Sequence, residues 1–192
     1  MLDKRPVPRV FTRMAVADVE NLVTQVRDHY VAKFRSFLQG QQASCTTGAA
    51  EVKFSLEADT AAFHRLAVVD FVRNDDGPEG VLFEPESFLT FDRVEGNIAK
   101  TALVIEGLRW DATVIHHDVP YIADAIEEWF RKWFDPDEIR LDHAADLSNC
   151  IHAVYIELNE LQVDFGTAPT EAFWELLDSL AAGNATSVNV RS

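Results

Sequence analysis

Residues 88–117, FLTFDRVEGNIAKTALVIEGLRWDATVIHH, decide the fold that the sequence predicts. Apolar and polar residues alternate along this stretch, and its two breaks, Glu95-Gly96-Asn97 and Glu106-Gly107-Leu108, are short turns. Alternation is the period of a half-buried strand. Links this short join antiparallel neighbours, because a parallel crossover needs about a dozen residues or more. We therefore predict consecutive strands over 88–94, 98–106 and 109–117, paired as an antiparallel β-meander.

Further strands are expected on both sides of this stretch. In residues 51–57 the alternation places Val52 and Phe54 on the buried face and Glu51 and Lys53 on the polar face. The other expected strands are residues 66–73, 81–84, 149–158 and 161–165, with 187–190 as a last edge strand.

Three amphipathic helices are predicted, at residues 16–38, 118–134 and 167–182, because apolar residues recur there at steps of three and four. Asp118 is expected to cap the second helix. Helices placed before, between and after the strands indicate an α+β fold, in which one antiparallel β-meander sheet packs against an N-terminal, a central and a C-terminal helix. We expect a single domain over residues 15–192, preceded by a flexible basic arm at 1–14.

Composition narrows the classes of partner. The 192 residues include 32 acidic and 17 basic side chains, a formal charge of −15. Such a field repels nucleic acids and anionic membrane surfaces, so neither is an expected partner. The start of the chain lacks the apolar segment of a signal peptide, and Cys45 and Cys150 are too far apart in sequence for a disulfide framework. A cytoplasmic protein with two free thiols is expected.

Residues 129–134, WFRKWF, form the densest aromatic patch. Packed against the sheet, they make a buried helix face. Four large aromatic side chains in six residues nevertheless cover more than one face of a helix. Because aromatic anchors dominate interface energetics, an overflow of Phe130 or Phe134 onto the surface predicts a homodimer.

His116-His117-Asp118 is the most suggestive cluster for a site, because it lies where a strand leads into a helix. Adjacent residues of a strand point to opposite faces, so the two histidines do not share a metal ion. Counting inward positions from Trp110 places His116 inward and His117 outward. We expect no metal and no cofactor, and a ligand pocket on the concave sheet face near Trp110 and His116.

No nucleotide-binding, nucleophile-elbow, zinc-protease or EF-hand motif occurs in the chain. Two hypotheses for function remain. The favoured one is a non-catalytic acidic binding protein, comparable to inhibitor or immunity proteins, that captures a basic partner protein through electrostatic steering. The alternative is a small-molecule-binding protein or metal-dependent enzyme with its site near His116. An enzyme is thus the less favoured class.

Overall fold

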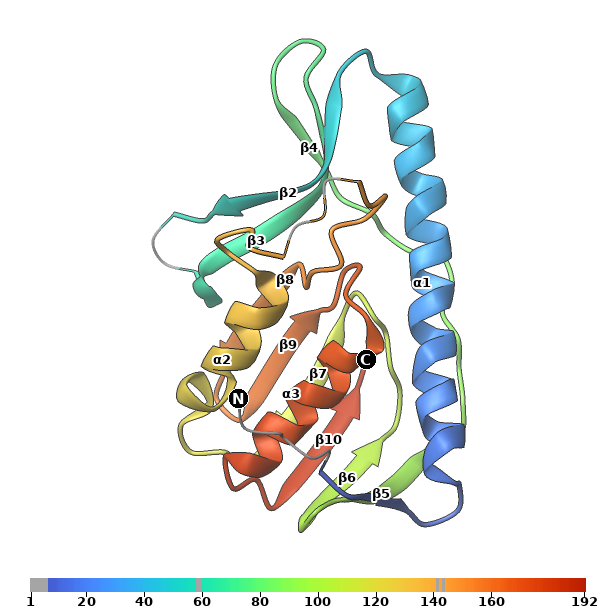
Figure 1. Cartoon of the computed structure of the whole chain (residues 1–192), viewed down its shortest axis with the longest axis vertical. Coiled ribbons are helices and arrows are strands. Elements are labelled where there is room, and N and C mark those ends of the chain that lie inside the picture. The colour runs from blue at the N-terminus through green and yellow to red at the C-terminus, as the bar shows by residue number, and fades with distance from the viewer. Residues whose placement is uncertain (1–6, 58–59, 141, 143) are drawn as a thin grey trace.

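A computed structural model describes residues 7–57, 60–140, 142 and 144–192 of the chain. The described part contains three helices and ten strands, which confirms the α+β class (Figure 1). Within the same residues, no helix combines the length and the apolar character needed to cross a membrane. The helices are α1 (Val16–Ser44), α2 (Ile122–Phe134) and α3 (Thr170–Ala182). The strands are β1 (Arg9–Phe11), β2 (Gly48–Ser55), β3 (Ala62–Arg73), β4 (Glu79–Val81), β5 (Val94–Ile98), β6 (Thr101–Ile105), β7 (Thr113–His117), β8 (Ala153–Glu157), β9 (Glu160–Asp164) and β10 (Ser187–Arg191).

All ten strands join one mostly antiparallel sheet in the order β1-β5-β6-β10-β7-β9-β8-β3-β2, with β4 paired to β3. The predicted β8-β9 hairpin is present. A hairpin also joins β5 and β6, but its turn is at residues 99–100, and the predicted turn at 95–97 lies inside β5. The predicted pairing of β6 with β7 is wrong, because β10 lies between them, parallel to β6 and antiparallel to β7. The last strand is therefore central rather than an edge strand. Its Val188 and Val190 side chains are buried, which explains why this position suits it.

The strand predicted over residues 88–94 is also wrong for most of its length. Only Val94 begins a strand, and residues 82–93 form an irregular connection that runs from β4 to β5. Figure 1 shows this green segment passing alongside α1. The apolar–polar alternation that predicted a strand therefore describes an extended segment that has no neighbour in the sheet.

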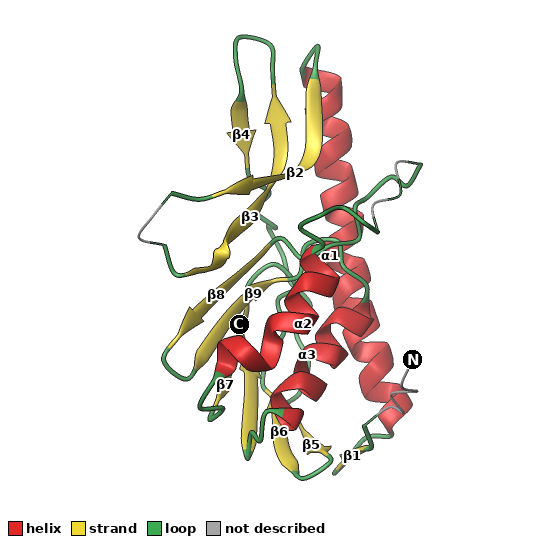
Figure 2. Cartoon of the chain, turned by 60° about the vertical axis from the view of Figure 1, so that its left-hand side comes forward, coloured by secondary structure: helices red, strands yellow, loops and turns green. Residues whose placement is uncertain are grey.

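The helices lie on one side of the sheet, as Figure 2 shows. Side chains of β7 and β10 alternate between buried and more exposed positions, so only one face of this part of the sheet is covered. Helices α2 and α3 pack against each other, and the indole of Trp129 donates a hydrogen bond of 2.7 Å to the carbonyl oxygen of Ala172. The longer helix α1 contacts β1, β3 and α3.

The aromatic patch of α2 belongs to the core. Trp129, Phe130, Trp133 and Phe134 are at most 4% exposed. Helix α2 turns this patch toward the sheet and α3, so the overflow of Phe130 or Phe134 onto a subunit interface does not occur. The homodimer stays a prediction, but the aromatic side chains on which it was based are buried rather than exposed.

The expected basic arm is partly built into the sheet. Arg9–Phe11 forms β1, which pairs with β5, and the guanidinium of Arg9 donates to Asp178 at 2.8 Å while it lies over the ring of Trp174. Residues 1–6 of the arm lie outside the described residues. The part of the arm next to the domain is thus an edge of the sheet.

Asp118 does not cap α2, contrary to the sequence prediction. The residue before α2 is Tyr121, and no side chain caps the helix there. Asp118 instead accepts hydrogen bonds from the backbone N–H of Thr186, at 2.8 Å, and from its hydroxyl. These bonds attach the loop before α2 to the beginning of β10 and so help to hold β10 beside β7.

Candidate metal centre

Two acidic side chains face each other inside the sheet. Ala50 is paired with Phe71 and Val52 with Val69, so the register places Glu51 of β2 opposite Asp70 of β3. The Glu51 and Asp70 side chains are only 4% and 8% exposed. Like charges directly opposite each other destabilise a sheet, and burial makes the repulsion stronger. This pair therefore requires a cation between its members.

His152 occupies that position, just before β8. Its Nε2 lies 3.0 Å from Glu51 Oε1 and its Nδ1 lies 2.9 Å from Asp70 Oδ1. The imidazole is 1% exposed and packs edge-on against Phe34 of α1, with ring centroids 5.7 Å apart. Both nitrogens of the ring thus lie within ion-pair distance of a carboxylate, but only Nε2 has the geometry of a hydrogen bond. The arrangement fits either an imidazolium or an imidazole that binds a metal through Nε2.

Hydroxyl and backbone donors complete the surroundings of Glu51. The hydroxyl of Ser148 donates to Oε1 at 2.6 Å, the hydroxyl of Thr167 donates to the same oxygen at 2.5 Å, and the backbone N–H of Ser148 donates to Oε2 at 2.7 Å. Both residues come from loops that flank the β8–β9 hairpin. The carboxylate is therefore fixed in place by two loops that are distant from Glu51 in the sequence.

The backbone is adapted to this cluster at two residues. Glu51 has φ of 50°, an uncommon conformation for a non-glycine residue inside a strand. It turns the Glu51 side chain inward, although the alternation of β2 predicted an outward position. Gly166 has φ of 50° and touches the imidazole so closely that an added Cβ would lie 2.1 Å from His152 Cδ2. Strained backbone of this kind is concentrated at functional sites.

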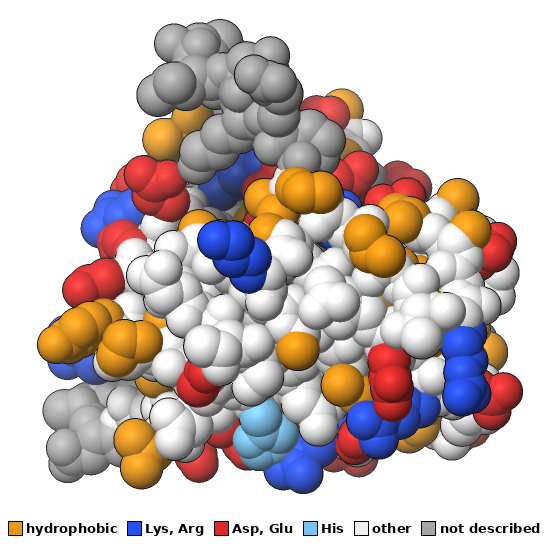
Figure 3. Space-filling view, turned by 90° about the horizontal axis from the view of Figure 1, so that it is seen from below, with side chains coloured by type: hydrophobic (Ala, Val, Ile, Leu, Met, Phe, Trp, Pro, Cys, Tyr) orange, Lys and Arg blue, Asp and Glu red, His pale blue; other side chains and the backbone are white. Residues whose placement is uncertain are grey.

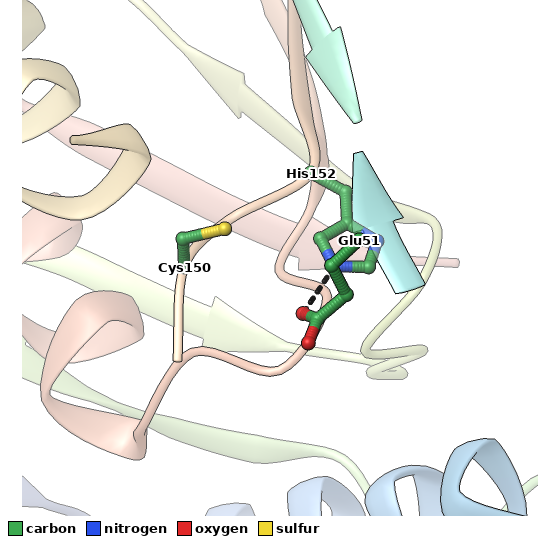
Figure 4. A group of neighbouring side chains, drawn as sticks. All are labelled: Glu51, Cys150 and His152. Carbon is green, nitrogen blue, oxygen red and sulfur yellow. Dashed lines mark hydrogen bonds and ion pairs between the residues drawn. The ribbon is translucent and has the colours of Figure 1, made fainter. Parts of the chain in front are cut away.

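Cys150 supplies a third metal-binding atom. The Glu51 carboxylate, the Cys150 sulfur and an imidazole nitrogen of His152 all lie within 4.8 Å of one another. Figure 4 shows the sulfur pointing toward the other two side chains. Burial raises the pKa of the Cys150 thiol, and the Ser148 hydroxyl lies 3.0 Å from its sulfur. A buried thiol with a raised pKa is a poor free nucleophile, so the arrangement fits a metal ligand better than a catalytic cysteine.

The pKa values of the cluster follow from burial and charge pairing. Burial disfavours the charged form of His152, but Asp70 and Glu51 outweigh it and hold the pKa of His152 well above its usual value. Burial likewise opposes ionisation of Glu51, yet the hydrogen bond and charge of His152 bring the pKa of Glu51 below its usual value. Asp164, which accepts the backbone N–H of Gly166 at 2.8 Å, has its pKa raised to about 7, chiefly by burial. Negative charge thus surrounds the imidazole.

A cavity of about 120 Å³ reaches the cluster from the surface. Ser148 and Cys150 form part of its wall, whereas Glu51 and His152 do not. Lys53 and Arg140 bring positive charge to the same wall, and the ammonium of Lys53 donates to the carbonyl oxygen of Asp135 at 2.6 Å. The remaining lining residues are Trp133, Asp135, Asp142 and Asn149. Of the three candidate ligands, Cys150 is thus the one that borders the cavity.

The ligand pocket expected near Trp110 and His116 stays a prediction, and the structure places the two residues in different surroundings. Trp110 is 1% exposed and packs against Phe165, with ring centroids 4.7 Å apart. The His116 side chain is 34% exposed on the uncovered face of the sheet, where its Nε2 lies 3.4 Å from a carboxylate oxygen of Glu160. The structure therefore separates the two residues. Neither lines the cavity beside Cys150.

His117 is the inward histidine, opposite to the sequence expectation. Residues 107–112 do not form a strand, so alternation counted from Trp110 does not extend into β7. His117 is 6% exposed, and its Nδ1 accepts the backbone N–H of Val119 at 3.2 Å. Burial lowers its pKa, and the charge of Asp118 opposes this shift only in part.

This lowered pKa of His117 predicts a dependence of stability on pH. Below the unfolded-state pKa of about 6.5, the unfolded chain binds a proton more readily than the folded chain, so stability falls as the pH falls. We expect wild type to lose more unfolding free energy than His117→Asn between about pH 7.5 and 5.5, by less than about 1 kcal/mol because His117 is only partly desolvated. Urea unfolding at both pH values measures this difference. Equal losses in the two proteins would contradict it.

A sequence pattern other than helix or strand periodicity indicates the buried cluster. Asp70 lies in AVVDFV, His152 in CIHAV and Asp164 in LQVDF, so each is a lone ionisable residue within an apolar strand-like run. Buried charges are almost always paired or bound to a metal, and three such residues therefore predict a shared cluster. Glu51 has no comparable signal, because its inward position depends on the positive φ. Cys45, the other thiol, lies just after α1 and is half-buried.

No protein-family model, curated protein or solved structure matches the chain. The geometry of the site is therefore the basis for the function proposed below.

Proposed function

We propose that this protein is a metalloprotein that binds one Zn²⁺ ion, or a transition metal of similar preference, through Glu51, Cys150 and His152. The observation that carries the proposal is the convergence of a thiol, an imidazole and a carboxylate within 4.8 Å in the interior. These are the three ligand types that zinc takes in proteins. The ion would replace the proton on His152 Nε2 and the thiol proton of Cys150.

The groups behind the three ligands support this proposal. A metal-bound histidine usually donates its second N–H to a carboxylate, which fixes the ring and strengthens it as a ligand. Asp70 Oδ1 lies 2.9 Å from His152 Nδ1, within the distance of such a bond but without its angular geometry, so a small turn of the ring would complete it. Ser148 and Thr167 orient Glu51 in the same way. Both the ligands and their supports are therefore present before a metal binds.

Three protein ligands leave the fourth position of a tetrahedral zinc ion for water or substrate, as in catalytic rather than structural sites. The cavity borders Cys150, one of the three ligands. This function corresponds to the metal-dependent alternative predicted from the sequence, but its site lies at Cys150 instead of near His116. The proton-bridged state, with His152 as imidazolium, is the competing arrangement of the same residues.

Metal analysis after chelation, reloading and desalting separates these two states. We expect one Zn²⁺ per wild-type chain, and more than about 100-fold weaker binding for Cys150→Ser, because losing a ligand exceeds the 10–100-fold effect of losing a second-shell partner. Asp70→Asn is expected to weaken binding by about 10–100-fold. In the Co²⁺-loaded protein, a sulfur-to-cobalt charge-transfer band should be present in wild type and absent in Cys150→Ser.

Cys45→Ser is the matched control, because it removes the other free thiol and leaves the cluster intact. It should keep full metal content and the charge-transfer band. Circular dichroism identifies any variant that fails to fold. If wild type and Cys150→Ser are both folded and wild type retains no more metal, the metal site is excluded. The imidazolium arrangement then remains.

A further inference from the structure

One exposed stretch of the chain carries negative charge without any positive charge of its own. Residues 74–92 contain six acidic residues and no lysine or arginine. All six side chains are exposed: Asp75, Asp76, Glu79, Glu84, Glu86 and Asp92. Residues 141–190 also contain eight acidic residues and no lysine or arginine, but Glu175 and Asp178 there form ion pairs with Lys132 and Arg9. Basic and acidic side chains also lie side by side on the face seen in Figure 3. The six exposed carboxylates of this stretch at 74–92 therefore favour a cation-rich partner.

Within this stretch, residues 84–92, EPESFLTFD, follow β4 as an extended chain without a strand partner. We call them the acidic segment. The backbone N–H of Phe83, just before it, donates to Asp70 Oδ2 at 2.7 Å, and the carbonyl oxygen of Ser87 lies 3.2 Å from His29 Nε2 of α1. In the part of the chain that the structure describes, no backbone–backbone hydrogen bond involves the acidic segment. Unpaired extended backbone is a template for strand pairing.

Apolar side chains of the segment are exposed as well. Phe88 is 40% exposed and Leu89 is 37% exposed, and Leu82, just before the segment, is 66% exposed. The guanidinium of Arg109 lies 3.9 Å from the ring centroid of Phe88 and covers part of it. The segment thus combines free backbone groups, apolar side chains and three carboxylates, which together are the elements of recognition by strand addition.

We propose that the acidic segment is a docking strand for an extended segment of another protein in which basic and apolar residues alternate. The backbone would supply hydrogen bonds, Phe88 and Leu89 would contact apolar side chains, and Glu84, Glu86 and Asp92 would pair with lysine or arginine. A second copy of this chain is excluded as the occupant by charge, because it would bring three further carboxylates to the same place. This proposal is independent of the metal centre and gives the expected basic partner a location.

A labelled synthetic peptide of alternating lysine and valine tests the proposal by fluorescence anisotropy. Wild type is expected to bind it, more weakly at higher salt. The variant Thr90→Pro keeps the charge but removes a backbone donor and blocks pairing at an exposed residue, so it should weaken binding by about tenfold or more. A peptide with N-methylated backbone should lose affinity similarly, because it lacks donors of its own.

Two charge variants complete the experiment. Reversing the segment with Glu84→Lys, Glu86→Lys and Asp92→Lys should abolish binding. The control variant Glu57→Lys, Asp124→Lys and Glu171→Lys has the same net charge and alters exposed acidic residues of other elements, so it should bind like wild type within about twofold. No binding by wild type, equal losses in the two reversals, or full binding of the methylated peptide would each overturn the proposal.

Discussion

Replacement of His152 by phenylalanine is expected to lower the free energy of unfolding of the metal-free protein by about 3–5 kcal/mol. Phenylalanine keeps a ring against Phe34 but removes both N–H groups, so Glu51 and Asp70 remain opposite each other without a cation between them. Removing one partner of a buried ion pair is costly because the remaining charge stays desolvated. Urea unfolding followed by tryptophan fluorescence, in the presence of a chelator, measures the loss.

A surface pair provides the matched control. His64 Nε2 lies 2.6 Å from Glu127 Oε2, but both side chains are at least one-third exposed. His64→Phe is expected to cost less than about 1 kcal/mol, because water screens an exposed pair. Adding Glu51→Gln and Asp70→Asn to His152→Phe should restore part of the lost stability, because the opposed charges are then removed. Similar losses for His152→Phe and His64→Phe would show that the buried cluster does not stabilise the fold through charge.

The elements of the fold follow from local periodicity, but their pairing does not. The three helices and the β8–β9 hairpin are predicted from the sequence because their signals lie within a few residues of each other. The insertion of β10 between β6 and β7 depends on which strands meet after α3 has folded back. No periodic pattern carries that information. For the same reason, residues 88–93 have the pattern of a strand but find no neighbour in the sheet.

The candidate site shows the same limit more strongly. Glu51 is 101 residues from His152 in the sequence, and its meeting with His152 and the nearby Cys150 depends on the β2-β3-β8 pairing. The sequence favours His116 because it lies where a strand leads into a helix and because alternation from Trp110 places it inward. Adjacent residues of a strand diverge, whereas residues on neighbouring strands converge. Lone ionisable residues within apolar runs are therefore a better indicator of a buried site than neighbouring histidines.

Gly166→Ala is expected to destabilise the protein by about 2–5 kcal/mol, the sum of about 1–2 kcal/mol for a left-handed backbone at alanine and about 1–3 kcal/mol for overpacking. The methyl group would lie 2.1 Å from Cδ2 and 2.4 Å from Nε2 of His152. The imidazole cannot turn away, because Glu51 and Asp70 hold its two nitrogens. Any folded Gly166→Ala protein should therefore have a displaced ligand and a lower zinc content than wild type.

Two other glycines separate the contributions to this loss. Gly77 has φ of 122° but nothing within 4 Å of an added Cβ, so Gly77→Ala measures backbone strain without a clash. Gly40 lies within α1 with open space around it, and Gly40→Ala should raise stability by up to about 1 kcal/mol through helix propensity. Because only Gly166 touches His152, a loss for Gly166→Ala no greater than that for Gly77→Ala would mean that the imidazole moves freely. The cluster would then lack the rigidity that a preformed metal centre requires.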